Sequence, residues 1–209
     1  MKLAIFGATG RTGMPLVKQA LEQGNEVVAL VRDPAKLSLQ NERLTLVRGD
    51  VMNAADVEKA VQGSDAVLSV IGQRKDSPED MQTVATRNIV AAMQKCGVRR
   101  IISLTGAGVD APEDQPKFSN HLIKTALKLL SGKVLKDAQG HAQVLHDSGL
   151  DWTIVRGPML NEGPYTGKYR VGWVGVNTSA RISRADLADF MLKQVSDETY
   201  RQKMPMISD

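Results

Sequence analysis

The chain has little cysteine, few aromatic side chains and no long hydrophobic run. Its 209 residues include one cysteine, Cys96, which excludes an internal disulfide and fits a reducing compartment. No apolar stretch approaches the roughly 20 residues that a membrane-spanning helix needs. The first residues also lack the basic and apolar regions of a secretion signal. These absences predict a cytoplasmic protein that does not bind membranes.

Signals for nucleic-acid and metal binding are also missing. The chain has three Phe and three Tyr, and its 27 Lys and Arg are scattered against 23 Asp and Glu, so no nucleic-acid partner is expected. The net charge of +4 favours anionic ligands only mildly. His121, His141 and His146 form no compact ligand cluster with carboxylates, so we expect no metal site and place each histidine on a helix surface.

Short apolar runs alternate with helical patterns along the whole chain. The pattern predicts strands at 3–7, 26–32, 44–50, 66–72, 100–106 and 151–157, and helices at 14–24, 53–63, 83–97 and 138–149, each helix ending at a glycine. Repeated strand–helix–strand units indicate an α/β fold with a Rossmann-type, doubly wound parallel sheet. We expect one domain over residues 1–209 with a small C-terminal substrate-side portion, and a monomer by default.

Residues 110–122 interrupt this alternation with a stretch rich in proline and charge. It follows the fifth predicted strand, where loops border the ligand crevice of such folds. Basic and apolar positions in 117–130 then fall on opposite helical faces, which predicts either an ordinary amphipathic helix or a flap over the site.

The glycine-rich turn "GATGRTG" follows the first strand and opens the first helix. Gly7 allows the chain to turn sharply, Gly10 lets the backbone approach a pyrophosphate, and Gly13 lets the helix pack closely on the strand. Thr9 and Thr12 add hydroxyl donors. Free N–H groups at a helix N-terminus bind phosphate, so the turn predicts dinucleotide binding.

The end of the second strand distinguishes between the two nicotinamide dinucleotides. An acidic residue there binds the 2′-hydroxyl of NAD, whereas an arginine accommodates the 2′-phosphate of NADP. This chain has Arg32 at the tip and Asp33 one residue later. Arg11, on the glycine turn, is a candidate second arginine of a clamp on that phosphate, because guanidinium groups suit phosphate geometry. We therefore expect NADP(H) as the cofactor.

Together, the motifs "GATGRTG", "LVRDP", "GDV", "NIVAAM", "SGLDWTIVRGPML" and "ISRADLADFML" resemble the atypical short-chain dehydrogenase/reductases with an NAD(P)H-binding domain. The resemblance is greatest to the flavin reductase / biliverdin-IXβ reductase group, with NmrA-like proteins as relatives. It covers nearly the whole chain and is weakest at about 110–135.

By position, the resemblance implies further cofactor-binding residues. They are Asp50 and Val51 beside the adenine, Ile71, Gly72 and Gln73 after the fourth strand, Leu104 and Thr105 on the nicotinamide side, and Gly157, Pro158, Met159 and Leu160 beside the nicotinamide ring.

The chain departs from this pattern at the positions of proton donors. The wider superfamily uses a Tyr-x-x-x-Lys pair, and no tyrosine here has a lysine four residues on. Gly106 stands where the flavin reductase group commonly has serine, and Met159 where it can have histidine. Thr105 is left as the candidate catalytic residue, in a hydrogen-bonding and positioning role.

The sequence thus predicts an NADPH-dependent reductase of a flat conjugated acceptor such as a flavin, a quinone or a related dye. Hydride transfer between two bound rings depends chiefly on their orientation, so no dedicated proton donor is required. One alternative is a non-catalytic module that senses the NADP(H) redox state for a protein partner. A sugar-nucleotide epimerase or dehydratase is disfavoured because about 50 residues after the sixth strand leave little room for a substrate domain.

Overall fold

The computed structural model describes the backbone of residues 1–73, 76–116 and 118–209, and the side chains of these residues except 118–130. Within this part of the chain, the central sheet has eight strands in the order β3-β2-β1-β4-β5-β6-β10-β8. The strands are β1 (Lys2–Phe6), β2 (Glu26–Val31), β3 (Leu44–Arg48), β4 (Ala66–Ser69), β5 (Arg100–Gly106), β6 (Asp151–Gly157), β8 (Arg170–Gly172) and β10 (Met206–Ser208). All neighbours pair in parallel except β8 and β10. The predicted doubly wound sheet is confirmed.

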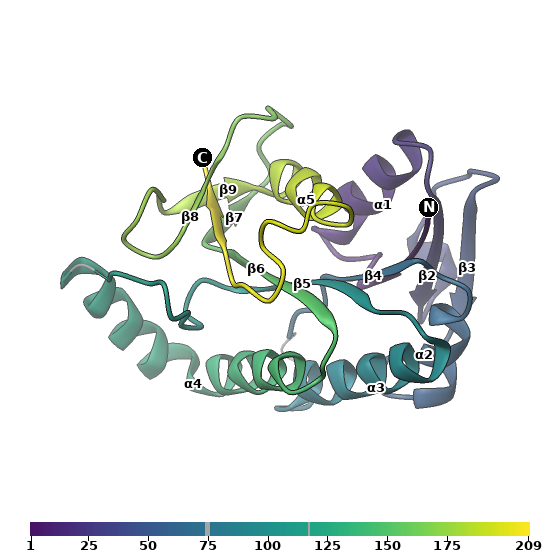
Figure 1. The fold of residues 1–209 in the computed structure, drawn as a ribbon, viewed down its shortest axis with the longest axis horizontal. Coiled ribbons are helices and arrows are strands. Elements are labelled where there is room, and N and C mark those ends of the chain that lie inside the picture. The colour runs from purple at the N-terminus through teal and green to yellow at the C-terminus, as the bar shows by residue number, and fades with distance from the viewer. Residues whose placement is uncertain (74–75, 117) are drawn as a thin grey trace.

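Helices cover both faces of this sheet, as Figure 1 shows. One face carries α1 (Gly13–Glu22) and α5 (Arg184–Lys193), and the other carries α2 (Ala54–Val61), α3 (Met81–Cys96) and α4 (Phe118–His146). Side chains alternate between the two layers along β1: Ile5 joins the cluster with Leu16 and Leu187, while Phe6 joins the cluster with Ile89. This alternation buries a strand on both faces, which is why the strands are continuous apolar runs.

Three short elements lie outside this sheet and its helices. They are η1 (Pro34–Lys36), β7 (Met159–Asn161) and β9 (Arg181–Ser183), and β7 and β9 form a parallel pair of their own. The predicted helix 138–149 is the last part of α4, whose backbone is interrupted at Ser131 with φ −142°. The side chains that would test the flap at 117–130 lie outside the described residues. Within the described residues, no helix is long and apolar enough to cross a membrane.

The loop after β5 is held by a buried ion pair. Arg156 of β6 is fully buried and donates to both carboxylate oxygens of Asp114 at 2.7 Å. It also donates to the carbonyls of Val109 and Met204, so most of its N–H groups have partners. Burial acts to raise the pKa of Asp114, but the hydrogen bonds from Arg156 and from the Ala111 N–H hold this pKa below its ordinary value. The first part of the predicted insertion, residues 110–116, is therefore anchored to the core.

His141 corrects an expectation from the sequence, because it is buried rather than on a helix surface. Its Nδ1 lies 3.0 Å from the Thr86 hydroxyl, and its Nε2 lies 3.4 Å from the Ser103 hydroxyl. Since the Thr86 hydroxyl donates to the Gln82 carbonyl, it accepts from Nδ1–H. Burial lowers the pKa of His141 to about 4, so the ring is neutral at pH 7.

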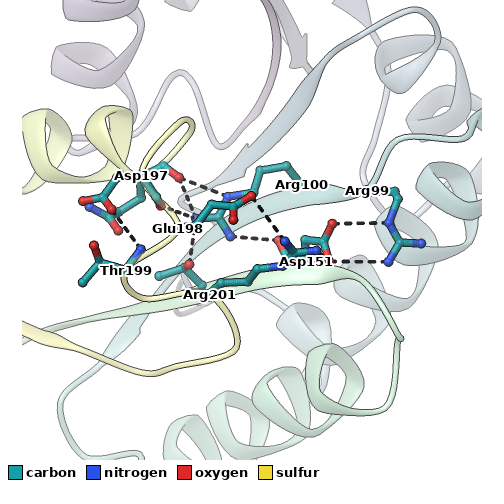
Figure 2. Close-up of polar contacts among 9 residues, drawn as sticks. Arg99, Arg100, Asp151, Asp197, Glu198, Thr199 and Arg201 are labelled. Carbon is teal, nitrogen blue, oxygen red and sulfur yellow. Dashed lines mark hydrogen bonds and ion pairs between the residues drawn. The ribbon is translucent and has the colours of Figure 1, made fainter.

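The amino ends of β5 and β6 are tied to the segment after α5 by charged side chains, as Figure 2 shows. Arg100 donates to the Gln194 carbonyl at the C-terminus of α5 and to the Thr153 hydroxyl at 2.8 Å. Burial, and next the charge of Arg201, lowers the pKa of Arg100. Arg99 instead makes an exposed ion pair with Asp151 at 3.3 Å. The partly buried Arg100 thus caps a helix C-terminus, where a cation is favourable.

The two arginines provide a matched pair of substitutions. Arg100→Met leaves the Gln194 carbonyl and the Thr153 hydroxyl without this donor, and hydrogen bonds to charged groups contribute about 1.5–3 kcal/mol. Arg99→Met removes an exposed ion pair worth ~1 kcal/mol or less. We expect denaturant unfolding to show the larger loss of stability for Arg100→Met. Equal losses would contradict the capping role.

Candidate functional site

The strand order reverses between β1 and β4, so the crevice for a ligand lies at the carboxyl ends of these two strands. The glycine-rich turn leaves β1 at this edge and leads directly into α1. Figure 1 shows α1 on the opposite face of the sheet from α3 and α4. The sequence-predicted cofactor residues lie in the segments that follow β1 to β4, at the carboxyl ends of β5 and β6, and at the start of β7.

Two glycines of the turn are required by close backbone contacts. Gly7 has φ +86°, and a Cβ there would lie 2.9 Å from the carbonyl carbon of Val70. A Cβ on Gly13 would lie 2.1 Å from the Gly7 carbonyl oxygen, far inside van der Waals contact. Only glycine at both positions lets α1 begin this close to β1 and to the loop after β4.

The outer side of the turn is open. A Cβ on Gly10 would have one neighbour within 4 Å, the Gly7 carbonyl oxygen at 3.2 Å. Thr9, Gly10 and Arg11 are exposed, while Thr12 is buried. Thr12 is the N-cap of α1, but its side chain makes no capping hydrogen bond, whereas Asn53 caps α2. An uncapped helix N-terminus beside an open glycine suits the pyrophosphate of a dinucleotide.

Arg32 directly follows β2 and is exposed. Its side chain makes no hydrogen bond or ion pair with other described residues. Its neighbour Asp33 accepts from the Ala35 N–H at 3.1 Å and caps η1. The carboxylate at this strand end is therefore used locally, which leaves Arg32 as the free charged group. Arg11 does not contact Arg32; its Nη1 lies 3.9 Å from Glu162 Oε1.

The residues after β3 form a tight turn at the same edge. The Asp50 carboxylate accepts from the Met52 N–H at 2.9 Å, and the Val51 carbonyl accepts from the Asn88 side chain at 2.9 Å. Both Asp50 and Val51 are half-buried. The link from Asn88 of α3 holds the turn in place, and the half-buried Val51 side chain packs against the core.

The loop after β4 is held by a carboxylate that sequence reasoning missed. Ile71 and Gly72 continue from β4, but the Gln73 amide turns away and donates to Asp137 at 3.1 Å and to the Glu79 carbonyl at 2.6 Å. Asp137 is buried on α4 and accepts from the N–H groups of Gln82 and Thr83. Asp137 thus caps α3 from another helix, while the adjacent Asp80 makes no side-chain cap. A partner so distant in the sequence leaves no local signal.

The ends of β5 and β6 form an apolar surface with one buried hydroxyl. Thr105 is 5% exposed, and its Oγ1 has no hydrogen-bond partner among the described residues. Leu104 and Leu160 converge on Gly157, where a Cβ would lie 3.6 and 2.9 Å from their methyl groups. Leaving a buried hydroxyl unpaired costs about 1–3 kcal/mol. The Oγ1 atom is closed off from solvent, so a bound molecule would reach it after a shift of the side chains that cover it.

The neighbouring positions leave this surface accessible. A Cβ on Gly106 would meet nothing within 4 Å. Pro158 is half-buried, and Met159 is 67% exposed, the highest value among the large hydrophobic side chains in the described part of the chain. An exposed thioether is a flexible apolar contact for a flat ring.

The structure contains a tyrosine–lysine contact that the sequence spacing hides. The Tyr169 hydroxyl donates to Asp189 at 2.7 Å and lies 3.0 Å from Lys193 Nζ. Burial is the largest influence on the hydroxyl and raises the pKa of Tyr169 to about 12. A catalytic tyrosine requires a pKa closer to the working pH. This trio joins α5 to the residue before β8, and the raised pKa keeps the Tyr169 hydroxyl protonated.

Glu162 and Arg184 were not identified from the sequence. Glu162 follows β7, and Arg184 is the first residue of α5, directly after β9. The pairing of Asn161 with Ser183 brings them together, and Arg184 Nη1 lies 2.7 Å from Glu162 Oε1. The same oxygen is the one nearest Arg11, so two arginines approach one carboxylate beside the glycine turn.

Comparison with known proteins gives one family and several relatives. A family model described as NAD(P)H-binding matches residues 7–198. The uncharacterized protein YwnB of Bacillus subtilis is 27% identical over 97% of this chain and 96% of its own length. The photosystem II assembly factor Ycf39 of Synechocystis is 24% identical over 99% of this chain, which spans only 62% of that protein. A solved structure of ChuY, an anaerobillin reductase from Escherichia coli O157:H7, has a TM-score of 0.81 and 21% identity, covering 100% of this chain and 97% of ChuY.

Two alanine substitutions separate the folding and binding roles of the turn. Gly13→Ala forces a Cβ against the Gly7 carbonyl at 2.1 Å and should lower the free energy of unfolding by ~2 kcal/mol or more. Gly10→Ala needs a shift of a few tenths of an ångström and should fold, but its methyl group occupies the path of the pyrophosphate. Thermal melts and NADPH fluorescence titrations check both. Tight NADPH binding by folded Gly10→Ala would show that the phosphate lies elsewhere.

Proposed function

Because this chain belongs to the NAD(P)H-binding family, we propose that it is an NADPH-dependent reductase that transfers a hydride to a flat, conjugated acceptor such as a flavin, a quinone or a related dye. One observation carries this proposal. The open, uncapped start of α1 and the apolar surface with the unpaired Thr105 hydroxyl lie at the same edge of the sheet. A dinucleotide along this edge would have its phosphates at the start of α1 and its nicotinamide at the apolar surface.

The nicotinamide supplies the hydride, and this chain orients the two rings. Leu104, Leu160 and Met159 exclude water from the faces of the rings, and the Thr105 hydroxyl fixes one of them by a hydrogen bond. Gly106 and Met159 bring no ionisable group to the ends of β5 and β6. This favours an acceptor that is protonated from solvent after hydride transfer, as the reduced forms of flavins and quinones are. It disfavours a simple carbonyl that needs a general acid.

NADPH is proposed over NADH because of the end of β2. Arg32 is free there, while Asp33 is used as a cap, so the strand presents a cation and not a carboxylate acceptor for a 2′-hydroxyl. Arg11 is exposed and held only by the weak contact with Glu162, so its long side chain can turn toward a 2′-phosphate. We propose Arg32 as the main contact of that phosphate and Arg11 as an auxiliary one.

A second candidate function is a non-catalytic module that binds NADP(H) and reports its redox state to a protein partner. The relative Ycf39 favours this alternative, because it is named as an assembly factor and not for a reaction. The name of ChuY, an anaerobillin reductase, favours catalysis. Both candidates share the same dinucleotide site.

Turnover distinguishes the two candidates. NADPH is mixed with catalytic amounts of the protein and with FMN, riboflavin or a quinone, and the loss of absorbance of the reduced nicotinamide is followed. We expect steady consumption of NADPH with at least one of these acceptors. NADPH that binds but is not consumed with any of them would favour the sensing module.

The Arg32→Asp variant tests the choice of cofactor. It removes charge-assisted bonds worth roughly 1.5–3 kcal/mol and places a carboxylate against the 2′-phosphate, so NADPH affinity should fall at least ~10-fold. NADH lacks this phosphate and can donate its 2′-hydroxyl to the new carboxylate, so its affinity should hold or rise. Titration of both cofactors against both proteins is the measurement. Equal weakening of the two cofactors would remove Arg32 as the discriminating residue.

A further inference from the structure

Arg184 is a buried arginine that leaves most of its hydrogen-bonding capacity unused. Its side chain is 9% exposed, yet within the described residues it makes one hydrogen bond, from Nη1 to Glu162 Oε1 at 2.7 Å. A guanidinium has five N–H donors. Its Nε and Nη2 atoms have no hydrogen-bond partner among the described residues, and neither atom is fully sealed from solvent.

Arg156 shows how this protein builds a purely structural buried arginine. That guanidinium donates to both oxygens of Asp114 and to two backbone carbonyls, and the Asp114 side chain is only 9% exposed. Arg184 has no such enclosure, because its single partner, Glu162, is 66% exposed and reaches it from the solvent side. A carboxylate held in this way can leave at little cost, since water solvates it again.

The position of Arg184 is the second argument. The β7–β9 pairing places Arg184 next to Glu162. Glu162 lies two residues after Leu160, the last residue of the segment Gly157–Leu160 that contributes to the apolar surface. On the other side, Arg11 of the glycine turn approaches the same Glu162 oxygen at 3.9 Å. Glu162 and Arg184 therefore lie beside the glycine turn and directly after the segment that contributes to the apolar surface.

We propose that Arg184 binds an anionic group of a ligand, a phosphate or a carboxylate, and that Glu162 occupies this position in the free protein. The partly buried guanidinium forms charge-assisted hydrogen bonds that are stronger than those of an exposed arginine. The incoming anion replaces the Glu162 carboxylate as the partner of Arg184, and no covalent bond is made or broken. The inference rests on the proposed function only for the identity of the ligand.

Two ligands could supply this anion: the pyrophosphate of the dinucleotide, or an anionic substituent of the acceptor. FMN and riboflavin separate these sources, because they share one ring system and differ in a phosphate. The experiment measures the Kd values of NADPH, FMN and riboflavin by fluorescence titration, without turnover. The variants are Arg184→Gln, Glu162→Gln and, as a matched control, Arg181→Gln, which removes the same charge from an exposed position three residues away on β9.

Arg184→Gln should weaken the ligand that supplies the anion by roughly 10-fold or more. Glu162→Gln should strengthen that ligand several-fold, because the internal competitor loses its charge. A change in the Kd of NADPH identifies the dinucleotide as the source of the anion. A change in the Kd of FMN with no change in the Kd of riboflavin identifies the acceptor.

If neither variant changes any of the three Kd values more than Arg181→Gln does, Arg184 is a structural ion pair and the inference is wrong. Glu162→Gln changes an exposed side chain, so it decides the question alone should Arg184→Gln not fold. A protein that reduces no acceptor would contradict the proposed reductase function, whereas the NADPH titration would still test the anion site.

Discussion

The close stacking of three backbone segments around Gly7 is the constraint on which the rest of the site depends. The chain reverses at Gly7 with φ +86°, directly against the Val70 carbonyl group, and α1 begins with Gly13 on the Gly7 carbonyl oxygen. Any Cβ at Gly7 or Gly13 would separate β1, α1 and the loop after β4. This contact aims the N-terminus of α1 along the edge of the sheet where the strand order reverses. The anion-binding capacity of the helix therefore follows from a steric fact.

The parts of the fold that the sequence reveals are those with local physical causes. Runs of apolar residues identify β1, β2, β4, β5 and β6 because those strands are buried on both faces, and the edge strand β3 keeps a shorter, half-buried apolar run. The glycines expected at the ends of helices, Gly24, Gly63, Gly97 and Gly149, all have positive φ, between +67° and +81°. Each of these signals lies within a few residues of the structure it specifies, so no knowledge of the tertiary fold is needed.

What the sequence hides depends on partners that are distant along the chain. Asp137 caps α3 although it lies 54 residues beyond Thr83, and Arg156 pairs with Asp114 across 42 residues. His141 has no neighbour in sequence that predicts its burial against Thr86 and Ser103. The three-residue strands β7 to β10 are too short for a periodic pattern. The site has the same division: the glycine turn is readable, whereas Glu162 and Arg184 meet only through the β7–β9 pairing.

Arginines at the amino ends and at the carboxyl ends of the strands differ in how many hydrogen-bond partners they have. At the amino edge, Arg100 is surrounded by carbonyl and hydroxyl oxygens, and it joins β5 to the end of α5 (Figure 2). Each nitrogen of this guanidinium therefore has at least one partner, so its burial leaves little desolvation penalty. At the carboxyl edge, Arg184 has one exposed partner and Thr105 has none within the described residues. A folded protein that leaves these groups unpaired is less stable than it would be with apolar residues in their places. The same deficit becomes binding free energy when a ligand supplies the missing partners, so the carboxyl edge is complete only with its ligands.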